Sequence, residues 1–198
     1  GLSFIEGAGG FIVSAETSAS YEGEPAGSVL LDVRATGWLD NDGTLRSGPE
    51  FVRARAMASG TPAALLAPVL ERAGLRPSEV LGETVSVDVR AGMRTAAGDG
   101  EAFITVGDRR VELPEVGVPY VAASLASRLT SVWASLEFDD RSVRSREGGV
   151  QVQTDAAGAM LRPLLDGSGY TARAGGTAIL DVTGFSVPIA AAGATGGA

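Results

Sequence analysis

The chain has 198 residues, a net charge of −8 and 44% hydrophobic residues, a composition typical of one globular domain. It contains no cysteine, histidine or lysine, which excludes thiol and imidazole catalysis, Schiff-base chemistry, the Walker lysine and nearly all zinc or copper sites. The acidic balance disfavours binding to nucleic-acid phosphates and anionic membranes, and no apolar run is long enough to insert into a membrane.

The first part of the chain predicts strands. Residues 2–38 contain short apolar and β-branched runs, separated by a Gly- and Pro-containing turn at 22–27. The acidic and glycine residues at 40–43 then predict a second tight turn, because Asp, Asn and Gly favour turn conformations.

A helix is predicted over residues 61–73. Thr61 is a good N-cap, Pro62 suits the first helical position, and Gly74 suits the C-cap. Apolar residues between them recur at helical spacing. Pro68 conflicts with a continuous helix, so we expect either a bend or a later start there.

Residues 83–113 predict a β-meander. Valines alternate with polar residues at 85–90, which is the pattern of a half-buried strand. The segment from Phe103 to Leu113 predicts a hairpin, since its two-residue turn begins with Gly107, as a type I′ or II′ turn requires.

The strongest helical pattern covers residues 119–136. Apolar residues recur at steps of three and four, and Ser, Thr and Arg occupy the other positions. The apolar stripe consists of Val118, Val121, Leu125, Leu129, Val132 and Leu136. We expect this stripe to pack on the protein's own sheet rather than on a partner subunit.

The last part predicts two elements and a tail. Asp155 is expected to cap a brief helix that ends at Leu165. Strands are expected at 150–154, 177–182 and 185–189. The tail 190–198 contains only Ala, Gly and Thr, so in isolation it is expected to be mobile.

These elements predict a single α+β domain over residues 1–189, followed by the Ala/Gly-rich tail 190–198. Strict alternation of strand and helix is missing, which argues against a doubly wound parallel sheet. We therefore expect a mostly antiparallel sheet, sandwich- or barrel-like, with two main helices packed on one side.

A short pattern occurs three times, with an aspartate between two aliphatic residues and a glycine soon after. The aspartates are Asp32, Asp88 and Asp181. On a strand each aspartate faces away from its neighbours. The preferred interpretation is three half-buried strands with solvated aspartates, and the alternative is a ring or lumen lined by carboxylates once subunits assemble.

The string from Asp40 to Leu45, Asp-Asn-Asp-Gly-Thr-Leu, is the most suggestive chemical motif. It resembles the first motif of haloacid-dehalogenase-type phosphatases. The resemblance implies a Rossmann-like fold, Asp40 as the nucleophile, Asp42 as the acid/base and a Mg²⁺ ion. That family holds the phosphate with a lysine, which this chain lacks.

The same string partly matches a calcium-binding loop. In that alignment Trp38 and Pro49 occupy the first and last ligand positions, where carboxylates are required. We prefer the interpretation of 40–43 as an Asx-rich hairpin turn with no metal or cofactor.

The densest arginine cluster is also interpreted as structural. Its members, Arg141, Arg144 and Arg146, are offset by Asp139, Asp140 and Glu147. Such a segment predicts a solvated mixed-charge loop, with no direct sequence-specific nucleic-acid binding.

With most catalytic side chains missing, we expect a structural, self-assembling subunit of a virion, phage tail or other tube or shell, without catalytic activity. Its partners would be copies of itself and neighbouring subunits, in a virion or extracellular assembly. One alternative is a secreted or surface module that holds an apolar ligand between the sheet and the 118–136 helix. The other is a Mg²⁺-dependent phosphohydrolase using Asp40 and Asp42.

Overall fold

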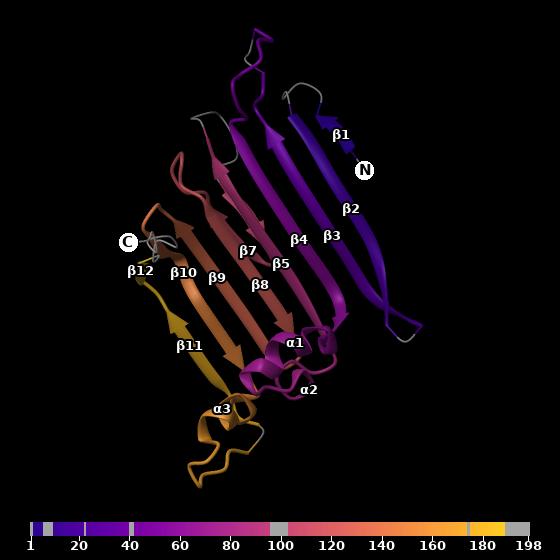
Figure 1. The fold of residues 1–198 in the computed structure, drawn as a ribbon, viewed down its shortest axis with the longest axis vertical. Coiled ribbons are helices and arrows are strands. Elements are labelled where there is room, and N and C mark those ends of the chain that lie inside the picture. The colour runs from indigo at the N-terminus through magenta and orange to yellow at the C-terminus, as the bar shows by residue number, and fades with distance from the viewer. Residues whose placement is uncertain are drawn as a thin grey trace, which may run out of the picture.

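A computed structural model describes residues 2–5, 10–21, 23–39, 42–95, 103–173 and 175–188. In these ranges the chain forms a ten-stranded antiparallel sheet, a separate two-stranded hairpin and a few short helices (Figure 1). The prediction of a mostly antiparallel α+β fold is confirmed. The sheet is a single open layer and not a closed barrel, because its first and last strands lie at opposite edges.

The large sheet is an up-and-down meander. Its strands are β1 (Leu2–Ile5), β2 (Gly10–Tyr21), β3 (Glu24–Thr36), β4 (Phe51–Pro62), β5 (Thr84–Arg94), β8 (Tyr120–Ser127), β9 (Thr130–Phe138), β10 (Ser142–Thr154), β11 (Ala178–Val182) and β12 (Ser186–Pro188). They lie side by side in chain order, and both β11 and β12 pair with β10. Most strands of the sheet therefore pair with the next one along the chain, through a short turn between β8 and β9 and through longer connections at 37–50, 63–83 and 95–119.

The helices gather at one end of the sheet (Figure 1). They are 3₁₀ turns at Ala63–Leu66 and Glu71–Ala73, and the α-helices α1 (Ala67–Leu70), α2 (Pro77–Val80) and α3 (Ala157–Leu165). Each described helix is short, so none is a main helix of the predicted kind.

The helix predicted over 61–73 is interrupted. Thr61 and Pro62 end strand β4 instead of starting the helix. Pro68 lies in the first turn of α1, because its ring and missing N–H exclude it from a helix interior. Gly74 ends the helical segment in the left-handed conformation, as predicted.

The helix predicted over 119–136 is wrong, since these residues form β8 and β9. Val121 and Leu125 fit a helical spacing, but together with Ala123 they also occupy alternate positions of a strand. β8 pairs with β5 on one side and β9 on the other, so backbone hydrogen bonding to distant residues decides between the two periods.

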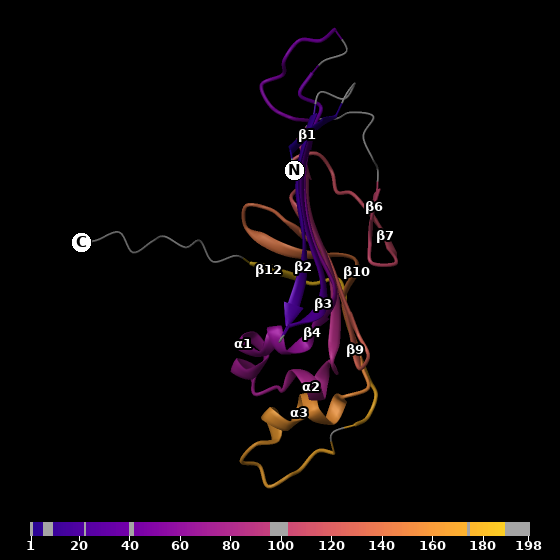
Figure 2. The ribbon, with the colours of Figure 1, turned by 90° about the vertical axis from the view of Figure 1, so that its right-hand side faces the viewer.

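The predicted hairpin is confirmed as β6 (Phe103–Val106) and β7 (Arg109–Glu112). It lies on one side of the large sheet, over a core whose members are Phe51, Ile104, Val106, Val111, Leu113, Tyr120, Ala122 and Trp133 (Figure 2). The N–H of Gly107 donates to Oδ2 of Asp88 at 3.2 Å, and a Cβ at Gly107 would lie 2.6 Å from Oγ of Ser124. Glycine at the turn therefore lets the hairpin approach the sheet closely.

The helices pack on the opposite side of the sheet at its end (Figure 2). Their core consists of Ala63, Val80, Leu81, Ala156 and Ala159. Leu125 of strand β8 packs against this core. A buried hydroxyl chain crosses this core. Thr130 donates to the Val80 carbonyl at 2.5 Å, its oxygen lies 2.8 Å from the Thr154 hydroxyl, and the Ala156 N–H donates to Thr154 at 2.9 Å.

The remaining predictions near the C-terminus are partly confirmed. Strands at 150–154, 178–182 and 186–188 are present, and α3 ends at Leu165. Asp155 does not cap α3, because its carboxylate accepts a hydrogen bond from Thr177 at 2.9 Å. The predicted tail 190–198 lies outside the described residues.

Candidate functional site: an uncovered apolar sheet face

The register of the long strands places an uncharged surface on one side of the sheet. Opposed residues of antiparallel strands lie on the same face, so the pairing defines rows that cross the sheet. The first row is Ala15, Leu31, Ala56, Val89, Ala123, Ala134, Val150 and Val182. The second is Val13, Val33, Ala54, Ala91, Val121 and Leu136. The third is Phe11, Ala35, Val52 and Met93. We call these three rows the apolar face.

The helices cover only one end of the apolar face. Leu125, which follows the first row toward that end, packs against them. Beyond the helices most of the side chains stay at least partly accessible, with Val13 45%, Leu31 52% and Val33 41% exposed, whereas Ala35 in the third row is buried. Single exposed leucines or valines are ordinary, but a contiguous patch of them is a candidate contact surface.

Two neighbouring strands give the apolar face its relief. Strand β3 presents Val29, Leu31 and Val33, which form a ridge of branched side chains. Beside it, at the positions opposite these three residues, β4 presents the methyl groups of Ala54, Ala56 and Ala58, which form a furrow. Each ridge residue lies directly opposite a furrow residue in the register.

On the opposite face of the sheet, which we call the polar face, charged side chains pair with one another. Asp88 accepts hydrogen bonds from Nε and Nη2 of Arg55 at 3.1 and 3.0 Å, and Nη2 of Arg90 lies 3.5 Å from Oδ2. Burial raises the pKa of Asp88, but the hydrogen bonds from Arg55 and Gly107 and the charge of Arg90 outweigh it and hold that pKa below 3.8. Asp88 thus joins β4, β5 and the hairpin turn.

The three repeated aspartates all lie on this polar face. Asp88 and Asp181 belong to one row across the sheet, through Ser124, Trp133 and Gln151. The expectation that the aspartates are solvated is wrong for Asp88 and Asp32, which are buried. Asp32 pairs with Nε of Arg34 at 3.0 Å. Only Asp181 of the three is exposed, and it accepts a hydrogen bond from Gln151 at 3.1 Å. The carboxylate-lined lumen stays a prediction.

The turn at 40–43 has the local geometry of an Asx turn where it is described. Asp42 is exposed and accepts hydrogen bonds from the N–H and the hydroxyl of Thr44 at 2.9 and 2.6 Å. The Thr44 hydroxyl, followed by the Thr44 N–H, lowers the pKa of Asp42. Asp40 lies outside the described residues, and the residues that are described contain no group of three acidic side chains placed to hold a metal.

The arginine cluster forms ion pairs, as expected, but the prediction of a solvated loop is wrong, because Arg144 and Arg146 belong to strand β10 and the Arg146 side chain is only 18% exposed. Arg144 lies 2.7 Å from Asp139, Arg146 lies 3.0 Å from Glu137, and the exposed Arg141 lies 3.6 Å from Asp140. The N–H of Arg141 and the hydroxyl of Ser142 lower the pKa of Asp139. These contacts neutralise the cluster locally.

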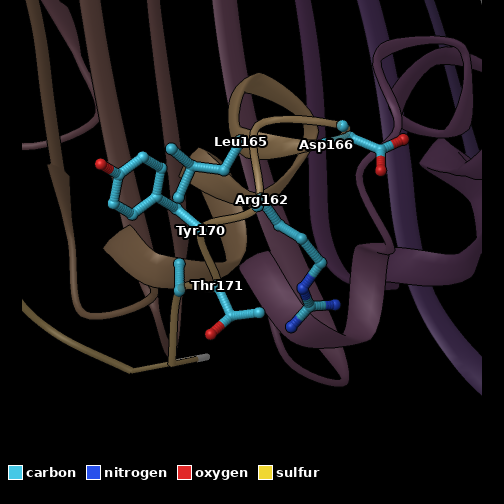
Figure 3. A pocket seen from close by; sticks show the side chains of 8 residues that line it. Arg162, Leu165, Asp166, Tyr170 and Thr171 are labelled. Atoms are coloured by element: carbon cyan, nitrogen blue, oxygen red, sulfur yellow. The ribbon is translucent and has the colours of Figure 1, made fainter.

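A hollow of about 370 Å³ lies beside α3 (Figure 3). It is lined by Arg162 and Leu165 of the helix and by the loop that follows, including Asp166, Tyr170 and Thr171. Arg162 pairs with Glu79 of α2 at 2.6 Å. The apolar-ligand alternative required a helix at 118–136, and these residues form strands.

Sequence reasoning missed the apolar face, although alternation was visible in several segments. Apolar residues occupy every second position at 29–35, 52–58, 87–93 and 121–125. Alternation by itself predicts single strands, whereas the register that aligns these positions into rows comes from the tertiary structure.

Comparison of the chain with protein-family models, with curated proteins and with solved structures gave no match. Among the helices that the structure describes, none is long and apolar enough to cross a bilayer.

Proposed function

We propose that the chain is a structural subunit of a self-assembling tube or shell, such as a virion or phage-tail component, without catalytic activity. The apolar face is the single observation that carries this proposal. A protein domain normally buries its sheets between two packed layers, whereas most of the apolar face has no second layer within the described chain. A neighbouring subunit would supply that layer.

The energetics favour burial by a partner. Fully burying one Val or Leu side chain is worth about 1.5–3 kcal/mol, so a row of half-exposed side chains gains several kcal/mol when covered. The loss of translational and rotational freedom on association costs at least about 4 kcal/mol. A contact that spans several strands can exceed this cost, whereas a few scattered side chains cannot.

The edges of the sheet offer a second kind of contact. In the described chain β1 pairs with only the first part of β2, at Gly10–Val13, and β11 ends the sheet on the other side. Open strand edges accept another strand through backbone hydrogen bonds. A face contact together with an edge contact is sufficient to build a tube or shell, with copies of the chain and neighbouring subunits as partners in a virion or extracellular assembly.

Sedimentation velocity over a wide range of protein concentration, followed by negative-stain electron microscopy, tests the proposal. We expect species larger than the monomer that grow with concentration into rings, tubes or shells. A strict monomer at every concentration would contradict it. Mg²⁺-dependent release of phosphate that Asp42→Asn abolishes would instead support the phosphohydrolase alternative.

A further inference from the structure

We infer that the apolar face is covered by the apolar face of a second copy of this chain, with β3 of each copy lying over β4 of the other. This inference rests on the proposed function and names the contact that assembly would use. It is carried by the absence of charge on the apolar face and by its relief, and the area of the face fits a weak contact.

The absence of charged side chains on the apolar face favours a partner surface that is also uncharged. None of the side chains in its three rows is charged, although the protein carries 24 acidic and 16 basic residues elsewhere. A charged partner would leave its own charges buried without counter-ions, which is costly. The face therefore fits a second flat surface that is equally free of charge, and the same face of another copy is such a surface.

The relief of the apolar face complements itself. The β3 ridge and the β4 furrow are neighbours of equal length in the register, Val29 opposite Ala58, Leu31 opposite Ala56 and Val33 opposite Ala54. A twofold axis parallel to the strands, midway between two facing sheets and between β3 and β4, places each ridge over the other copy's furrow. Residues keep their height along such an axis, so Leu31 of one copy faces Ala56 of the other.

The area suits a weak, reversible contact. The axis superposes β3 on β4 and β2 on β5, and these four strands carry all three rows, whereas β1 over β8 adds only a margin. With strands about 4.8 Å apart and rows about 6.7 Å apart, the four strands contribute about 400 Å² per copy, or about 800 Å² for the pair. This is the size of a weak, transient interface. The helices of both copies would border the contact at the same end.

The first experiment compares two identical substitutions by sedimentation velocity. Leu31→Glu places a carboxylate on the ridge, and we expect it to weaken self-association at least tenfold. Leu45→Glu changes a leucine that is 76% exposed and lies outside the sheet, so association should match the wild type. Far-UV circular dichroism should be unchanged in both, because Leu31 is also half exposed in the single copy.

The second experiment uses the absence of cysteine, which makes any introduced thiol unique. Leu31→Cys and Ala56→Cys copies are mixed and treated with a bismaleimide that spans the roughly 10 Å between packed sheets. We expect cross-links in the mixture and within each variant, because the two copies of Leu31 would lie only about 11 Å apart across the axis. Leu45→Cys, as the control, should give none.

The outcomes separate the inference from the proposed function. Assembly that persists in Leu31→Glu, or assembled Leu31→Cys and Ala56→Cys copies that give no cross-link, would overturn the β3-over-β4 contact and leave the assembly proposal standing. A wild type that stops at a dimer supports the contact and contradicts the tube or shell. A wild-type monomer that binds neutral phosphatidylcholine vesicles through Leu31 would contradict both, since a lipid would then cover the face.

Discussion

The two faces of the large sheet are covered to different extents by the rest of the chain. On the polar face the β6–β7 hairpin folds back over β8 and β9, and Asp88 links its turn to the sheet. On the apolar face the helices cover one end, and Leu31 and Val33 remain about half exposed. The hydrophobic effect alone would cover the apolar face first. Under the proposed function, a second molecule would complete the apolar face as the hairpin completes the polar one.

The largest difference between the faces should appear when a side chain is truncated on each. Ile104→Ala empties a position in the hairpin core, where the side chain is 3% exposed, and should lower the free energy of unfolding by about 2–5 kcal/mol. Leu31→Ala should change it by no more than about 0.5 kcal/mol, since its side chain is half solvated. Urea denaturation at concentrations where the protein is monomeric measures both. Equal losses would mean that the apolar face is already buried within one chain.

The anchor of the hairpin should have the next largest effect. Asp88→Asn removes a charged acceptor shared by Arg55, Arg90 and the Gly107 N–H, and should cost about 1.5–3 kcal/mol. Amide exchange at Gly107 should accelerate, because the turn loses its contact with the sheet. Asp181→Asn, at an exposed position of the same row, is the matched control and should be nearly neutral. A similar cost at both positions would contradict the anchor.

A smaller loss is expected from the hydroxyl chain beneath the helices. Thr130→Val keeps the shape of the side chain but leaves the Val80 carbonyl without its donor, which should cost about 1–2 kcal/mol. Thr105→Val, on the exposed side of β6, should be within about 0.5 kcal/mol of the wild type. Thermal unfolding of the two variants compares them. An unchanged Thr130→Val would show that the chain of hydroxyls adds no stability to the helical end.

The smallest effect is the pH dependence of the polar face. The pKa of Asp88 in the folded protein lies below its ordinary value of 3.8, so its carboxylate stabilises the fold above that pH. This stability is lost as the pH falls through the lowered pKa. The difference in unfolding free energy between the wild type and Asp88→Asn should therefore shrink below about pH 4. Chemical denaturation from pH 7 to pH 2 measures it, and a constant difference would contradict the role of the charge.

Local chemistry was sufficient to predict some elements. The hairpin around Gly107 and the helix end at Gly74 were correct because a glycine with positive φ specifies each turn. Pro68 conflicts with a continuous helix, and in the structure it lies in the first turn of α1, which is only four residues long.

The failure at 119–136 has a non-local cause. Val121 and Leu125 fit both a helical and a strand period, so the local pattern could not decide. β5 on one side and β9 on the other form the hydrogen-bond ladders that fix the strand. The apolar face escaped notice for the same reason, since its rows join residues as distant as Ala15 and Val182.

Composition by itself determined that this protein has no thiol, imidazole or primary-amine side chain for catalysis, and local turns determined where many strands begin and end. Only the tertiary structure decided which alternate residues share a face and which face stays open. The reason is that hydrophobic burial has no direction along the chain, so its pattern becomes specific only when strand register aligns distant residues.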